Sequence, residues 1–311
     1  FISIALASIF LAFSTILGEG LGFLIDRYDV YVRVNILASI FDAIWISLGA
    51  WFYGLDGALY GLLIASVTQF IIYIIFLLKI SEVRKVILNL SFKSNLIIPI
   101  FKQAFGLQVT SLIVHICPLI ARAQIVIANG EAANGYLQVA IALAAYLFSL
   151  MMNGVWGNLH PFVAAHGNSE SSRYLLQKTL SRVVPFSAIA CILIVFTSPL
   201  LINIFYTPAF LPSQSFLVPY FAAELIFIFL SVLSAYLIAL KKNGLVFIGY
   251  STYFIILLSC VYILSDSIGP MSYVYGHMAG SLMLLILSTI WSLTTKVFNS
   301  KFLINILLIF T

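Results

Sequence analysis

The chain has 311 residues, of which 63% are hydrophobic and only 8% are charged, and its formal net charge is +5. A soluble domain is roughly 45–50% apolar and about 25% charged, so this composition excludes a soluble enzyme, a disordered chain and a nucleic-acid-binding domain. It predicts an all-α polytopic membrane protein, because the apolar runs are long and continuous. Three cysteines inside apolar runs form neither a disulfide framework nor a metal-site spacing, so we expect no metal and no cofactor.

The apolar runs predict a series of membrane-crossing helices, separated by turn residues at 54–57, 129–131, 241–244 and 266–270. In chain order the predicted helices cover residues 1–17, 31–53, 57–78, 97–127, 134–158, 183–205, 213–240, 244–265 and 270–293, followed by an apolar segment over 302–311. The first run is barely long enough to span a bilayer and begins with Phe1. We therefore expect that other helices precede it in the intact protein.

Positive charge alternates along the chain from one connection to the next. Every Lys and Arg except Arg122 lies in the connections 18–33, 79–102, 159–182, 241–242 and 296–301. By the positive-inside rule these connections are cytoplasmic, which predicts a multi-pass protein of the cell (inner) membrane. The other connections are short, which argues against an enzyme that acts on glycans outside the membrane.

The basic connection over 79–102 has apolar residues at helical spacing, namely Val83, Ile87 and Leu90, beside Arg84 and Lys85. This pattern favours a short amphipathic helix on the inner leaflet. An irregular basic loop is the alternative.

The beginning and the end of the chain share a pattern of helix, charged inner turn, helix, glycine-containing outer turn and helix. Transporters often consist of such repeats. If 213–296 repeats 1–79, three helices like those of 97–205 precede residue 1. We therefore predict a two-lobe bundle of six plus six helices in the intact protein, of which this chain lacks about the first three. Its parts are the last three helices of the N-terminal lobe (1–79), a cytoplasmic connector (80–96), the C-terminal six-helix lobe (97–301) and a further apolar segment (302–311).

Three motifs between residues 97 and 220 carry a family resemblance. The first motif is Ile-Val-Ile-Ala at 125–128 with Gly130, followed by Asn-Gly-Tyr-Leu-Gln-Val-Ala at 134–140. The second is Leu-His-Pro at 159–161, followed by Gly-Asn at 167–168. The third is Ser-Pro-Leu-Leu-Ile-Asn-Ile-Phe-Tyr at 198–206, followed by Ala-Phe at 209–210 and Pro212. On these motifs the chain resembles the polysaccharide (O-antigen, Wzx-type) flippases of the multidrug/oligosaccharidyl-lipid/polysaccharide exporter superfamily. The resemblance implies a transporter rather than an enzyme. Where that family often has Asp, this chain has Ala121 and Arg122, so the acidic role is not carried over.

Polar residues inside the predicted helices are costly, at about 2.5–3.5 kcal/mol for a charge at the membrane centre, and therefore face a wet cavity or a partner. Gln108, His115 and Arg122 are spaced by seven and form one stripe on a single helix. A second stripe on the next helix consists of Asn134, Gln138, Ser149, Asn153 and Trp156. If the two stripes face each other they line a hydrophilic substrate cavity. The alternative is that isolated polar residues hydrogen-bond between helices.

Arg122 is the strongest candidate for substrate binding, because a guanidinium is a forked and permanently charged donor suited to phosphate. A lipid-diphosphate-linked sugar carries such a phosphate across the apolar layer. The alternative is that Arg122 extends to the outer headgroups, about 10 Å away along the helix.

Asp42 and Glu224 lie at membrane depth and are candidates for binding a coupling ion, either H⁺ or Na⁺. The alternatives are a hydrogen bond in helix packing or a pair with Arg122. The histidines point less clearly to function. His115 is expected to be either a core histidine with its hydrogen bonds satisfied or a member of a proton relay. His277, on an apolar helix, is expected to serve packing.

The sequence therefore predicts a membrane transporter that flips a lipid-linked oligosaccharide, a polysaccharide repeat unit, by alternating access and with a cation as the coupling ion. Its partners would be that substrate, membrane lipids and the polysaccharide polymerase machinery, with no nucleic acid. One alternative is a multidrug/cation antiporter of the same superfamily. The other is a membrane-embedded glycan polymerase or acyltransferase, although no paired acid/base motif is present.

Overall fold

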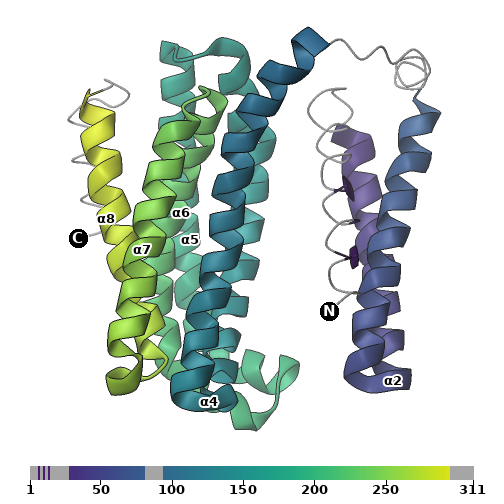
Figure 1. Cartoon of the computed structure of the whole chain (residues 1–311), viewed down its shortest axis with the longest axis vertical. Coiled ribbons are helices and arrows are strands. Elements are labelled where there is room, and N and C mark those ends of the chain that lie inside the picture. The colour runs from purple at the N-terminus through teal and green to yellow at the C-terminus, as the bar shows by residue number, and fades with distance from the viewer. Residues whose placement is uncertain (1–5, 8–9, 11–12, 15–27, 81–93, 295–311) are drawn as a thin grey trace. The chain divides into compact units, whose positions relative to one another are not determined.

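The computed structural model describes residues 6–7, 10, 13–14, 28–80 and 94–294 (Figure 1). These residues form helices joined by short turns, without a strand among them. Six helices of this part of the chain are long and apolar enough to cross a membrane. The all-α membrane fold predicted from composition is confirmed. The predicted inner-leaflet helix over 83–90, the segment 302–311 and most of the predicted helix over 1–17 lie outside the described residues.

The chain divides into two compact units, Phe1–Ser94 and Asn95–Thr311. In the first unit, α2 (Tyr28–Lys79) is a helical hairpin, because Gly54 has φ 61° and ψ −138° and interrupts the helix. Trp45 and Gly61 would lie about 24 Å apart in a straight helix, yet a Cβ on Gly61 would touch the carbonyl oxygen of Trp45. The two arms therefore pack backbone against backbone, and the turn lies between the predicted helices 31–53 and 57–78.

The second unit begins with α4 (Ser94–His166), which is also a hairpin. Gly130, with φ 85° and ψ 168°, turns the chain between its two arms. A hydrogen bond between Arg122 and Asn134, twelve residues apart, joins the arms on either side of the turn. The reversal agrees with the turn residues predicted at 129–131.

Helix α5 (Glu170–Phe205) begins well before the start predicted at residue 183. The hydroxyl of Ser169 accepts a hydrogen bond from the backbone N–H of Ser172 and caps the helix. The connection predicted over 159–182 is therefore mostly helical, because α4 continues to His166 and only a short turn precedes α5. The charged residues of this region were assigned to the connection between the two helices. They lie on a helix whose other side repeats buried residues every four positions, at Ser172, Leu176, Leu180 and Val184.

The remaining helices of the second unit are α6 (Gln214–Ala239), α7 (Asn243–Ile268) and α8 (Met271–Thr294), with the short 3₁₀ helix η2 (Pro208–Ser213) between α5 and α6. Most residues of α6 are buried, as expected for a helix that is apolar on every face. Helix α8 packs against both α6 and α7, and α5 packs against α6 (Figure 1). Helix α6 is therefore the centre of the core.

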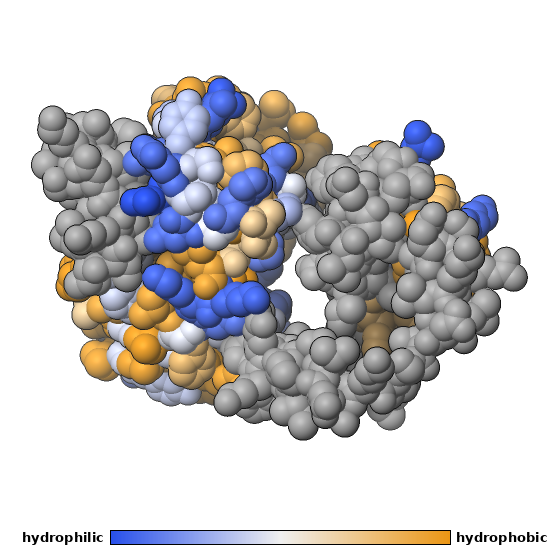
Figure 2. Space-filling model, turned by 90° about the horizontal axis from the view of Figure 1, so that it is seen from above, coloured by the Kyte–Doolittle hydropathy of each residue, from blue (hydrophilic) through white to orange (hydrophobic). Residues whose placement is uncertain are grey.

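The two ends of this bundle differ in charge. At one end the hydroxyl of Tyr236 donates to Asn168 Oδ1 at 2.8 Å, which joins α6 to the α4–α5 turn near the exposed Lys241. Figure 2 shows this end, where hydrophilic residues gather with hydrophobic residues around them. At the other end Asn129 Nδ2 donates to the carbonyl oxygen of Ser265 at 3.0 Å, near the exposed Asp266.

Candidate functional site

The predicted substrate stripe runs along the first arm of α4. Arg122 is half-buried, and its Nε donates to Asn134 Oδ1 at 3.4 Å. Arg122 also interacts electrostatically with Tyr273 of α8. The guanidinium therefore lies among polar groups of the same unit, about 12 Å along its helix from the turn at Gly130.

The other predicted members of the two stripes are more dispersed. Gln108 belongs to α4, but its side chain lies outside the described residues. His115 is exposed and donates to the carbonyl oxygen of Ser111 at 2.7 Å, so it is not a core histidine. Asn153 is exposed as well, and Gln138 has a buried amide oxygen without a hydrogen-bond partner among the described residues.

Trp156 is half-buried, and its ring centroid lies 5.1 Å from that of His160 one turn further along α4. The two stripes therefore meet at Arg122 and Asn134, which the structure brings together. The remaining members stay distributed along the two arms of α4.

In the first unit, Asp42 is half-buried, and its Oδ1 has no hydrogen-bond partner among the described residues. Asn35 lies about two turns earlier on the same arm and is engaged in packing, because its Oδ1 accepts a hydrogen bond from the hydroxyl of Tyr73 at 2.7 Å. Asp42 thus offers an unpaired carboxylate oxygen, whereas Asn35 holds the two arms of α2 together.

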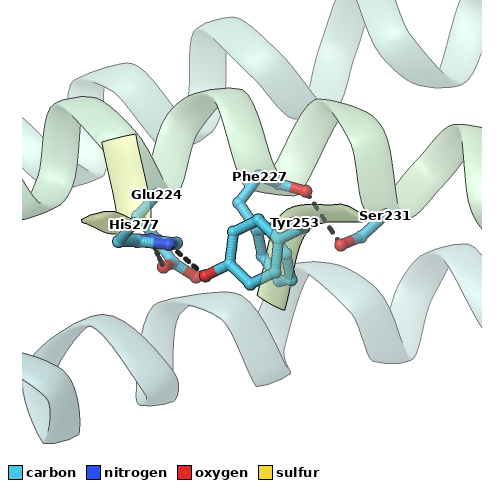
Figure 3. Close-up of polar contacts among 5 residues, drawn as sticks. All are labelled: Glu224, Phe227, Ser231, Tyr253 and His277. Carbon is cyan, nitrogen blue, oxygen red and sulfur yellow. Dashed lines mark hydrogen bonds and ion pairs between the residues drawn. The ribbon is translucent and has the colours of Figure 1, made fainter. Parts of the chain in front are cut away.

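The most enclosed polar cluster of the described residues lies on α6, α7 and α8 (Figure 3). Glu224 Oε2 lies 3.0 Å from His277 Nε2, and His277 Nδ1 lies 2.5 Å from the hydroxyl of Tyr253. All three residues are buried, with exposed fractions of 6%, 3% and 4%. From the sequence, Glu224 was predicted as an ion-binding candidate and His277 as a packing residue, and no pattern singled out Tyr253.

Two glycines of α8 let this cluster form. A Cβ on Gly280 would lie 2.7 Å from the Tyr253 ring and 3.0 Å from its carbonyl oxygen, and a Cβ on Gly276 would lie 3.0 Å from Leu257 O. The pair Gly276–Gly280 is a small-xxx-small spacing, which allows close helix approach in membranes. The approach of α7 to α8 brings Tyr253 within hydrogen-bond distance of His277.

Aromatic rings surround the imidazole. Ring centroids lie 4.9 Å from His277 for Tyr220 and 5.5 Å for Phe227, both on α6. Phe227 also packs on the ring of Tyr253 at 5.2 Å. This shell keeps water away from the Glu224–His277 pair. The signal in the sequence was two ionisable residues inside apolar helices, since each needs a partner when it is buried.

Comparison with known proteins rests on structure alone, since no protein-family model and no curated protein matches the chain. A solved structure of the lipid II flippase MurJ in an inward closed conformation matches with a TM-score of 0.68 over 97% of this chain, at 17% sequence identity. The chain has the MurJ fold. It spans 62% of the length of that MurJ chain.

The MurJ match confirms the all-helical membrane fold predicted from the sequence, and that solved protein is named as a lipid II flippase. At 17% sequence identity the match concerns the fold alone.

Proposed function

We propose that the chain belongs to a flippase that moves a lipid-linked oligosaccharide, a polysaccharide repeat unit, across the cell (inner) membrane by alternating access. The MurJ-like fold over 97% of the chain supports a flippase of a lipid-linked substrate. The proposed units are the end of the N-terminal lobe in 1–79, a connector over 80–96 and the C-terminal lobe in 97–301. The basic end of the second unit would face the cytoplasm.

The unpaired donor groups of Arg122 are the observation that supports a phosphate-containing substrate. Its Nε is the donor to Asn134, and its remaining N–H groups have no hydrogen-bond partner among the described residues. These groups form the fork that binds two oxygens of one phosphate. A lipid-diphosphate linkage supplies such oxygens at the boundary between sugar and lipid. Gln138, with its unpaired amide oxygen, could accept hydrogen bonds from sugar hydroxyls.

The same residue argues against the multidrug/cation antiporter, because a permanent positive charge repels cationic drugs. Asp42 and Glu224 are the proposed sites of ion coupling in the two units. Contact with polysaccharide polymerase machinery is part of the proposal, since a flipped repeat unit must be consumed on the outer side.

A complementation experiment tests this proposal. The full-length protein is expressed in a host that lacks its own flippase for a polysaccharide repeat unit, and surface polysaccharide is measured. We expect Arg122→Ala to abolish export and Arg122→Lys to retain part of it, because lysine keeps the charge but loses the fork. The control is Arg182→Ala, an exposed arginine of α5. Normal export by Arg122→Ala at equal membrane abundance would refute the role of Arg122.

A further inference from the structure

The cluster of Glu224, His277 and Tyr253 is a chain of hydrogen bonds buried in the core of the second unit (Figure 3). We propose that it binds one exchangeable proton, and that uptake of this proton reverses the hydrogen bond between Tyr253 and His277. The inference rests on the proposed function for its role in coupling, but proton binding by the cluster is testable without transport.

Donors and acceptors in the cluster permit two arrangements. Without the proton, the neutral imidazole donates from Nε2 to the Glu224 carboxylate, so Nδ1 accepts from the Tyr253 hydroxyl. With the proton, Nδ1 carries a hydrogen and donates to the Tyr253 oxygen. This holds whether the proton resides on the imidazole or on the carboxyl, because a protonated carboxyl donates to Nε2 and leaves the imidazole hydrogen on Nδ1. Tyr253 is therefore the donor in one state and the acceptor in the other.

The net charge of the cluster changes between these states from −1 to 0. Its titratable and charged surroundings consist of further phenols, one thiol and one cation. They are Tyr220 on α6, Tyr250 on α7, Tyr273 on α8, Cys191 on α5 and Arg122 on α4, which acts on Tyr273. None of the phenols or the thiol compensates a negative charge in the way a buried cation would. Because an unpaired buried charge is costly, the state of charge −1 needs access to water or another compensating group.

The cluster fits a proton better than a metal cation. Hard cations take six or more oxygen ligands in the case of Ca²⁺ and a near-ideal octahedron in the case of Mg²⁺. Here one carboxylate oxygen faces a nitrogen, and aromatic rings occupy the adjacent space. No group of three or more His, Cys, Asp and Glu that could hold a metal occurs among the described residues.

Proton release is coupled to conformation by the same burial. The proton leaves readily only when α6, α7 and α8 separate enough for water to stabilise the remaining charge. A ligand shifts a conformational equilibrium by its difference in affinity for the two states, so a proton held more tightly in the closed cluster favours close packing of these helices. A pH gradient across the membrane would then bias opening toward one side.

Infrared difference spectroscopy of the full-length protein in lipid vesicles tests proton binding directly. Between acidic and alkaline pH we expect a tyrosine ring–hydroxyl band to shift as Tyr253 changes from acceptor to donor. The band should vanish in Tyr253→Phe and in Glu224→Gln, and it should persist in Tyr262→Phe, a control at an exposed tyrosine of α7. Persistence of the band in Glu224→Gln, or its absence from the unmodified protein, would overturn the proposal.

A flipping assay in the same vesicles separates this inference from the proposed function. If one proton moves with each substrate, the steady-state distribution of the substrate should change by up to about tenfold for each pH unit across the membrane. Glu224→Gln should lose this response to the pH gradient. If flipping by the unmodified protein does not depend on the pH gradient, the coupling role is overturned. If the unmodified protein does not flip the substrate at all but the tyrosine band is intact, the proposed function is refuted and the proton site is supported.

Discussion

Replacement of His277 by leucine is expected to destabilise the second unit in a manner that depends on pH. The substitution leaves Glu224, which is only 6% exposed, without its partner. Removing the partner of a buried charged group costs about 3–5 kcal/mol, because it leaves an uncompensated buried charge. Glu224 can escape this cost by taking up a proton, and an unsatisfied neutral group costs about 1–3 kcal/mol. The loss should therefore be about 3–5 kcal/mol at alkaline pH and about 1–3 kcal/mol at acidic pH.

Denaturant unfolding of the full-length protein in mixed micelles measures this effect at two pH values. The double variant Glu224→Gln/His277→Leu should lose less stability than the sum of the losses of the two single variants. The reason is that the double variant contains no buried carboxylate that has lost its partner. His166→Leu, at an exposed histidine near the end of α4, is the control and should change stability little. Additive losses within about 0.5 kcal/mol, or a loss that is the same at both pH values, would refute the reasoning.

Three further substitutions probe other parts of the structure. Gly280→Ala should lower the free energy of unfolding by about 1–3 kcal/mol through overpacking against Tyr253, and it should weaken the pH dependence of stability. Gly244→Ala is the control in the same unfolding assay and should be harmless, because a Cβ there meets nothing within 4 Å. Ser169→Ala should lower stability by about 1 kcal/mol, because it removes the cap of α5. Slower backbone hydrogen exchange in the first turn of α5 than in the unmodified protein would contradict this role of the cap. Asp42→Asn should reduce transport without reducing membrane abundance, and a parallel fall of both would assign Asp42 to folding.

The two helical hairpins were predictable from sequence, because the residues that turn the chain have few alternatives. Gly54 and Gly130 have φ values of 61° and 85°, where a side chain is unfavourable, and each stands between apolar runs of membrane-spanning length. Local chemistry and the hydrophobic pattern therefore agree at these positions, and the fold class follows from them.

The start of α5 was predicted too late, because the charged residues before 183 were assigned to the connection rather than to the helix. Arg173 and Lys178 are spaced along a helix whose buried side carries Leu176 and Leu180, and this period of four was visible in the sequence. A helix can continue beyond the apolar layer wherever it keeps one buried side and has a good cap. Ser169 supplies that cap.

The role of His277 depended on contacts between residues far apart in the chain. Glu224 and His277 are 53 residues apart, and Tyr253 and His277 are 24 residues apart. Hydrophobic periodicity shows that all three belong to membrane helices, but not which faces of those helices meet. The glycine spacing of α8 was the local clue that its helix approaches a neighbour closely.

A flipping assay with purified full-length protein tests the central claim most directly. Vesicles carry a lipid-diphosphate oligosaccharide in both leaflets, and an enzyme or lectin outside reports how much substrate becomes accessible with time. We expect the protein to make the inner pool accessible, Arg122→Ala to do so far more slowly, and a cationic drug not to be moved. Movement of the cationic drug, with no flipping of the diphosphate-linked lipid, would refute the proposed flippase and assign the chain to drug transport.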